Sequence, residues 1–295
     1  MLRSLYFRHV KRLLPNRIHG LLNRFAVYLS GRRRERLRKI ILSYYNSHIP
    51  VSGMEHSIEF LKNNRFCFVP QVWTKEYLSM PVRVFKENGF RYVILDDGQK
   101  LFFKRDMDNF AIKKLLRELM MEQDSRSPHF YVRHEGGGIV VDCGAAEGLY
   151  GLLSVQKCEH LYLFESNADW VLPLEMTFRR YSHKVTIVNK YVGATDGDKS
   201  VSLDGFFAGK EIASLKADLE GAEQQMLEGA KMLFGAGRVA KASICTYHHP
   251  SHAGEFTKLL EGYGYEVTPA PGFIPHWKPP HLLTGVIWAR KSPES

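Results

Sequence analysis

The sequence lacks the features of several large protein classes. Only four cysteines occur among 295 residues, and none form a C-x-x-C pair, so a disulfide framework is not indicated. No run of about 18 apolar residues is present, and basic residues interrupt every apolar stretch near the N-terminus. We therefore expect neither a membrane-spanning helix nor a signal peptide. Low-complexity tracts and repeats are also missing, which leaves a globular protein that we expect in a reducing, cytoplasmic compartment.

Positive charge is concentrated at one end of the chain. Residues 1–39 contain twelve Lys or Arg and one acid, Glu35, whereas the other 256 residues carry 29 basic and 30 acidic side chains. This arm indicates an anionic partner, either membrane lipid or nucleic acid. Its apolar residues recur at helical spacing, which suits peripheral attachment to an anionic membrane surface. Packing on the rest of the chain, or pairing of two subunits in a homodimer, is the alternative.

The pattern predicts three segments. Residues 1–50 form a basic amphipathic helical arm, with Pro15 separating two helices and a third basic stretch after Gly31. Residues 51–130 form a small mixed α/β connector. It contains a hairpin at 91–103, in which Asp97-Gly98 supplies a tight two-residue turn, and a helix at about 109–121. Residues 131–295 form the domain in which we expect the ligand.

Short apolar runs alternate with helical stretches after residue 136. Such alternation predicts an α/β domain with a mostly parallel sheet covered by helices on both faces. Parallel sheets bind ligands beyond the carboxyl ends of their strands, so residues just after each run are the place to seek function. The runs are 139–141, 161–164, 185–188, 213–216, 242–245 and 283–289.

The first run ends in a glycine-rich turn, Asp142-Cys-Gly144-Ala-Ala-Glu-Gly148. Glycines allow a sharp turn and close approach of a ligand. The turn differs from the dinucleotide fingerprint G-x-G-x-x-G, because an acid precedes the first glycine by two positions. A carboxylate there repels a pyrophosphate but suits an ammonium or sulfonium group, and S-adenosylmethionine carries both.

The next two strand ends extend this interpretation. Glu165 ends the second run, 23 residues after Asp142, where a carboxylate can accept both hydroxyls of a ribose. The third run is followed by Gly193-Ala194-Thr-Asp-Gly197, whose small residues leave room for an adenine ring. An ordinary turn explains this last segment equally well.

The fourth and fifth strand ends carry the candidate catalytic residues. Lys216, Asp218, Glu220 and Glu223 surround the end of the fourth run and precede an expected helix at 224–234. The fifth run ends in Tyr247-His-His-Pro-Ser-His252. Zinc is discounted, since no Cys or fourth ligand is spaced to complete a tetrahedral site, and a single histidine here suits a general base.

These residues together resemble the FkbM family of methyltransferases. The resemblance implies the class I S-adenosylmethionine-dependent fold, which is Rossmann-like and has a mostly parallel seven-stranded sheet with helices on both faces. The resemblance covers residues 136–290 and rests on the segments 140–148, 164–165, 201–204, 215–223, 227–230 and 247–248. It implies O-methylation of a hydroxyl, often on a sugar or polysaccharide. The chain departs from the family pattern in three places. Ser166 stands where the family usually has proline, the segment between Gly193 and Leu203 is short, and the basic arm is not part of the pattern.

We accordingly expect S-adenosylmethionine as cofactor and a hydroxyl of a sugar or cell-surface glycan as acceptor. Asp218 is the first choice as general base and His248 the second, while a divalent metal on Asp218 and Glu220 is an option that the sequence does not decide. The expected cofactor contacts are Asp142, Gly144, Ala145, Gly148, Tyr150, Glu165, Ser166 and Ala194. The expected catalytic residues are Asp218, His248 and Lys216, and the expected acceptor contacts are Glu220, Glu223 and Tyr247.

Two other functions compete with this one. A nucleic-acid methyltransferase could grip phosphates with the basic arm, but the chain has neither the [Asn/Asp/Ser]-Pro-Pro-aromatic motif nor a Pro-Cys nucleophile pair. A non-catalytic, membrane-attached module with the same fold is the third hypothesis, and cofactor binding distinguishes it.

Overall fold

A seven-stranded sheet is the centre of the computed structural model, which describes residues 16–276 and 278–292. Its strand order is β11-β14-β10-β9-β4-β5-β6. The neighbours from β10 to β6 are parallel, and β14 runs antiparallel to both β10 and β11. This arrangement confirms the predicted Rossmann-like fold class. The strands are β4 (Ile139–Cys143), β5 (His160–Phe164), β6 (Val185–Val188), β9 (Ser214–Ala217), β10 (Lys241–Cys245), β11 (Tyr265–Pro269) and β14 (Val286–Lys291).

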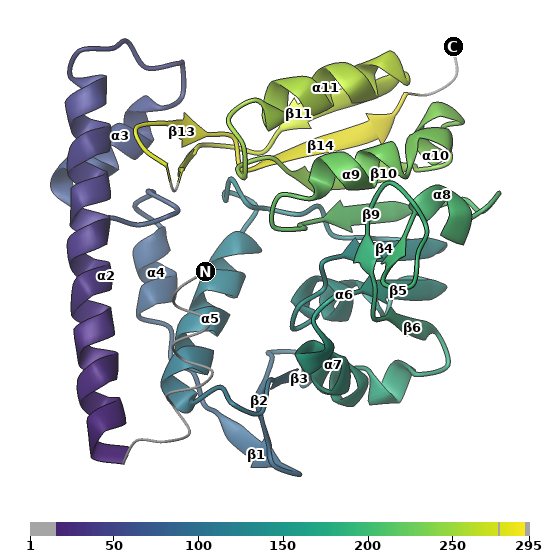
Figure 1. Cartoon of the computed structure of the whole chain (residues 1–295), viewed down its shortest axis with the longest axis horizontal. Coiled ribbons are helices and arrows are strands. Elements are labelled where there is room, and N and C mark those ends of the chain that lie inside the picture. The colour runs from purple at the N-terminus through teal and green to yellow at the C-terminus, as the bar shows by residue number, and fades with distance from the viewer. Residues whose placement is uncertain (1–15, 277, 293–295) are drawn as a thin grey trace.

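Helices cover both faces of the sheet because its strands are apolar on both sides (Figure 1). Val141 and Cys143 face a core shared with α8 to α11, whereas Val140, one residue out of phase, faces a core shared with α5 to α7. The first set comprises α8 (Leu203–Phe206), α9 (Glu223–Glu228), α10 (Lys231–Gly235) and α11 (His252–Gly262). The second comprises α5 (Asn109–Glu122), α6 (Leu149–Ser154) and α7 (Val171–Thr177), with the 3-10 turns η1 (Ala168–Trp170) and η2 (Arg179–Tyr181).

The basic arm contains one long helix, α2 (Asn16–Tyr45), which stands at one end of the molecule (Figure 1). The prediction of a separate stretch after Gly31 was wrong, because a single helical glycine costs only about 1 kcal/mol and does not end a helix. The predicted break at Pro15 lies outside the described residues. Leu37 and Ile41 of α2 pack on α3 (Glu55–Asn63) and on Leu282. No helix among the described residues is long and apolar enough to cross a membrane.

A small antiparallel sheet underlies α7. It consists of β1 (Phe85–Glu87), β2 (Phe90–Ile94) and β3 (Lys100–Phe103), so the predicted hairpin is present with an additional strand. Its turn is longer than predicted. Gly98 donates to the carbonyl of Leu95, and Leu95 donates to the carbonyl of Gln99, which leaves a three-residue loop with Gly98 at φ +81°. Asp97 accepts from the Gln99 amide, which favours this wider loop.

The helix predicted at 224–234 is divided into α9 and α10. The division lies at Gly229, where an added Cβ would overlap the carbonyl of Gly193. Asp204 also intervenes, because its carboxylate accepts from the backbone of Met232 (3.0 Å) and Leu233 (2.9 Å) and so caps the start of α10.

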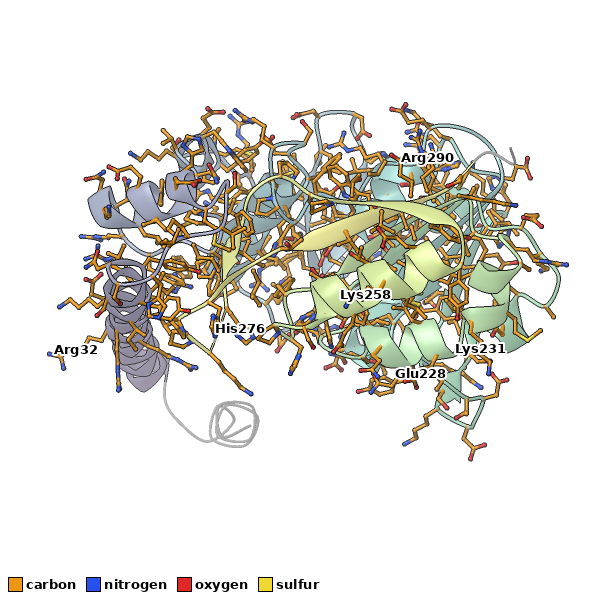
Figure 2. The ribbon with its side chains drawn as sticks, turned by 90° about the horizontal axis from the view of Figure 1, so that it is seen from above. Arg32, Glu228, Lys231, Lys258, His276 and Arg290 are labelled. Carbon is orange, nitrogen blue, oxygen red and sulfur yellow. The ribbon has the colours of Figure 1, made fainter. Side chains whose placement is uncertain are left out.

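The remaining elements are short. They are α4 (Thr74–Leu78), β7 (Tyr191–Val192), β8 (Ser200–Val201), β12 (Ile274–Pro275) and β13 (Leu282–Leu283). Seen from above, Arg32 of α2 lies at the opposite end of the molecule from Lys231 of α10 and Arg290 of β14 (Figure 2). The helical arm therefore lies at the end of the molecule opposite α10, and α4 stands beside it in Figure 1.

Candidate active site

A cavity of about 580 Å³, called the first cavity below, opens at the carboxyl ends of β4, β5 and β9. This is the edge at which open parallel sheets bind ligands. Its wall contains three acids, Glu165, Asp218 and Glu220, and one cation, Lys190. The other lining residues are Gly144, Ala146, Phe164, Ser166, Asn167, Trp170, Tyr191, Val192, Leu219, Gly221, Ala222 and Gln225.

Gly144 brings the backbone of the β4 loop against the end of β9. It has φ +82°, and an added Cβ would overlap the carbonyl oxygen of Asp218. Its amide and that of Ala145 both donate to the carbonyl of Phe164, at 2.9 and 3.0 Å. The turn therefore requires glycine at this position, and its backbone lies open to the first cavity.

Glu165 is held at the end of β5 by backbone amides. One carboxylate oxygen accepts from Ala146 (2.9 Å) and the other from Asn167 (2.6 Å). The side chain of Asn189 donates to the Glu165 carbonyl at 2.6 Å. Although the residue is only 8% exposed, it lines the cavity, so this fixed carboxylate presents free lone pairs to a ligand.

Asp142 and Lys216 form a buried ion pair beneath the loop. Lys216 Nζ lies 3.0 Å from Asp142 Oδ1 and donates to the carbonyl of Gly144 at 2.8 Å. Burial by itself disfavours the charged lysine, but Asp142 and Asp218 outweigh it and hold the pKa of Lys216 above its ordinary value. Neither Asp142 nor Lys216 lines the first cavity. The pair fixes the position of Gly144 from below.

Asp218 is oriented by a residue that sequence reasoning missed. The hydroxyl of Tyr131 donates to Asp218 Oδ2 at 2.9 Å, and Tyr131 is buried. Asp218 Oδ1 has no hydrogen-bond partner among the described residues. Asp218 lines the first cavity, but this unpartnered oxygen is itself buried. No local pattern could have revealed Tyr131, which lies 87 residues away in sequence.

His248 lies between two carboxylates. Its Nδ1 is 3.1 Å from Glu223 Oε1, and its Nε2 is 3.7 Å from Glu220 Oε2. Burial lowers the pKa of His248, but Glu220 and Glu223 outweigh burial and raise it to about 10. His248 therefore holds a proton at neutral pH and cannot accept one, which argues against it as the general base. Glu223, which is fully buried, also accepts from the Leu219 amide at 2.7 Å.

The same cluster has the donor atoms of a metal site. Ligand atoms of Asp218, Glu223, Cys245 and His248 all lie within 4.8 Å of one another. The reason given for discounting zinc was therefore wrong, because the end of β10 places Cys245 beside His248, and the β9 loop supplies the carboxylates. Sulfur, nitrogen and oxygen donors of this kind suit Zn²⁺, but His248 would have to lose its proton before it could bind a metal.

The structure distributes the predicted site residues over three positions. Gly144, Glu165, Ser166, Asp218 and Glu220 line the first cavity. The cavity is not lined by the exposed residue Ala194, nor by five buried residues around the loop: Asp142, Ala145, Gly148, Tyr150 and Lys216. Glu223 and His248 lie behind Asp218. Tyr247 stacks on His129, with ring centroids 4.7 Å apart.

A second cavity, of about 840 Å³, adjoins the first. Glu220 lines both. Tyr247 and His129 belong to its wall, together with residues of α3, of the segment 64–69 and of α5. The predicted acceptor residues Glu220 and Tyr247 are thus brought together here, whereas Phe60 of α3 and the aromatic and basic residues of α5 were not predicted.

Comparison with known proteins gives matches at the level of structure alone. No protein-family model matches the chain, and no curated protein matches it in sequence. Among solved structures, precorrin-6y C5,15-methyltransferase from Geobacter metallireducens is similar at 11% identity and a TM-score of 0.38, covering 54% of this chain and 84% of that one. Aeropyrum pernix fibrillarin with natively bound S-adenosyl-L-methionine is similar at 14% identity and a TM-score of 0.37, covering 71% and 99%. An rRNA methylase from Streptococcus thermophilus is similar at 14% identity and a TM-score of 0.37, covering 54% and 89%.

Proposed function

We propose that this protein is an S-adenosylmethionine-dependent methyltransferase that transfers a methyl group to a hydroxyl, in keeping with the resemblance to the FkbM family. The observation that carries the proposal is the charge of the first cavity. Three carboxylates and one lysine line it, and such a wall attracts a cation and repels a pyrophosphate. A cavity of about 580 Å³ lies within the range that small cofactors occupy.

The residues of the first cavity fit this cofactor. The backbone at Gly144, where no Cβ can stand, leaves room for close approach of the ligand. The fixed carboxylate of Glu165 suits two ribose hydroxyls. Trp170 and Tyr191 in the wall offer aromatic surface for an adenine ring. When bound, S-adenosylmethionine supplies an electrophilic methyl group on a sulfonium.

Asp218 is the proposed general base. Asp218 lines the first cavity; its Oδ2 accepts from Tyr131, and its Oδ1 is buried without a partner among the described residues. A hydroxyl that enters the first cavity and reaches this carboxylate can give up its proton to it. His248 and Glu223 position the loop that carries Asp218, and Lys216 with Asp142 positions Gly144.

Alignment of the acceptor contributes more to the rate of methyl transfer than removal of its proton does. Bringing a hydroxyl into line with a bound methyl group can supply on the order of 7–11 kcal/mol, without any charged intermediate. A sugar or glycan hydroxyl is the acceptor that the family resemblance implies. Its place would be the junction at Glu220, where the two cavities meet.

Calorimetry tests cofactor binding. Titration of the purified full chain with S-adenosylmethionine should show one site, and Glu165→Gln should weaken it about tenfold to a hundredfold, as expected for a lost hydrogen bond to a charged group. Glu175→Gln, an exposed acid on α7, is the matched control. No binding by the wild type removes the proposal. Transfer of tritiated methyl to cell-envelope fractions, with the product bond identified by mass spectrometry, tests O-methylation.

A further inference from the structure

The geometry of the second cavity points to an acceptor that is an anionic lipid: a hydroxylated head group joined through a phosphate to an apolar chain. This inference rests on the proposed methyltransferase function and specifies its acceptor. The second cavity is the larger of the two, at about 840 Å³, and it meets the first at Glu220. A head group that extends from the second cavity past Glu220 would enter the first cavity, whose wall includes Asp218.

The walls of the second cavity are mainly apolar. Phe66 and Met121 are buried in it, whereas Phe110 and Leu78 stand 68% and 53% exposed. Solvent exposure of such large apolar side chains beside a cavity is unfavourable, and an apolar chain covering them would gain roughly 25 cal/mol per Å² of surface removed from water. The other apolar lining residues are Phe60, Cys67, Phe68, Val69, Tyr247, Ile274 and Pro275.

The charged residues of the second cavity are predominantly positive. Six cations and three acids line it: Arg34, Arg65, Lys75, Lys113, Lys114 and Arg117, against Glu118, Glu122 and Glu220. Lys114 pairs with Glu118 at 3.1 Å. Arg65, Lys75 and Lys113 form no ion pair or side-chain hydrogen bond with any residue between 16 and 292 that the structure describes.

Among these cations, Arg117 has a guanidinium group that is fixed in position. Its Nε and Nη2 donate to the carbonyl of Met80, at 2.9 and 2.8 Å, so the guanidinium is held in place without a carboxylate partner. Lys113 precedes it by one helical turn on α5. A phosphate is the anion for which a fixed guanidinium and neighbouring ammonium groups are best suited.

The apolar walls and the positive charge of the second cavity together indicate the class of acceptor. A free sugar would leave the aromatic walls uncovered, and an uncharged lipid would leave the cations unpaired. A nucleic acid has the required charge but no apolar chain for Phe110 and Leu78. The amphiphile satisfies both, with its chain along Phe110, its phosphate near Lys113 and its head group toward Glu220.

The probe for this inference is n-decyl phosphate, kept below its micelle concentration, titrated calorimetrically into the full chain. It should bind at least about tenfold more tightly than either inorganic phosphate or uncharged n-decyl maltoside, because each lacks one of the two contributions. The double variant Lys75→Gln/Lys113→Gln should weaken it about tenfold or more. Phe110→Ser should weaken it by a similar factor.

Matched controls lie on other parts of the surface. Lys86→Gln on β1 and Leu172→Ser on α7 replace exposed residues outside the second cavity and should leave binding unchanged. S-adenosylmethionine affinity, measured on every variant, should also stay unchanged. Equal affinity for decyl phosphate and decyl maltoside, or no effect of the double variant, overturns the lipid inference while normal cofactor binding preserves the proposed function. Tighter binding of a short oligonucleotide than of decyl phosphate overturns it in favour of nucleic acid.

Discussion

Glu147 offers a quantitative test of how the loop of the first cavity is built. It follows Ala146, which has φ +47°, and is itself only 6% exposed. Burial raises the pKa of this carboxyl from 4.5 to about 7. The substitution Glu147→Gln keeps the size of the side chain and removes its titration.

The sign of the effect follows from proton linkage. Because the pKa is higher in the folded state, the folded protein binds more protons than the unfolded one between about pH 4.5 and pH 7. Stability therefore falls as the pH rises through that window and then levels off. At about 1.4 kcal/mol per pK unit, the ionised Glu147 destabilises the fold by up to about 3 kcal/mol at pH 8, but by less than about 1 kcal/mol at pH 5.

Urea unfolding at about pH 5 and about pH 8 measures this difference. Glu147→Gln should unfold at a similar urea concentration to the wild type at the lower pH, and should be more stable by about 2–3 kcal/mol at the higher pH. Glu135→Gln, whose side chain is 78% exposed, should follow the wild type at both. Parallel pH dependence of Glu147→Gln and the wild type would refute the reasoning, because the buried carboxyl would then not be the group that titrates.

Three further substitutions examine the site. Gly144→Ala should abolish S-adenosylmethionine binding and lower stability by about 2 kcal/mol or more, because the new Cβ meets the Asp218 carbonyl. Gly193→Ala has open space around it and should be nearly neutral. Thermal unfolding with and without cofactor compares the two variants. Asp218→Asn should reduce kcat about a hundredfold to ten-thousandfold with little change in cofactor affinity, and an unchanged kcat would exclude Asp218 as the base. His248→Gln should cost about 3–5 kcal/mol by leaving buried Glu223 unpaired, and the double variant His248→Gln/Glu223→Gln should recover most of it; equal loss in both would show that the ion pair is not the cause.

The sequence predicted the central sheet because its strands are apolar on both faces and are separated by helices. Val185–Val188 was predicted at its observed bounds. By contrast, β11 was missed, because its burial is confined to Tyr265 and the other four residues are polar or partly exposed. The continuous helix α2 was also missed, since a glycine near a run of arginines has the same pattern whether it ends a helix or lies within one.

The sequence named individual residues of the candidate site but not their contacts. The rule that function lies after each strand identified Glu165 and Asp218, which line the first cavity. The same rule could not separate Asp142, which faces Lys216 inside the protein, from an acid that faces a ligand. Tyr131, Phe60 of α3 and the basic and aromatic residues of α5 reach the site only through tertiary packing. No spacing in the sequence could therefore predict them.

The position of Glu220 between the two cavities has a consequence for ligand binding. It adopts φ +55°, a backbone conformation that is uncommon outside glycine, and it forms part of both cavities. A ligand that fixes this wall from one side changes the shape and charge met by the ligand on the other side. With the cofactor in the first cavity and the acceptor in the second, as proposed, the two binding steps share a coupling free energy that is reciprocal by necessity. Each ligand then changes the affinity of the other.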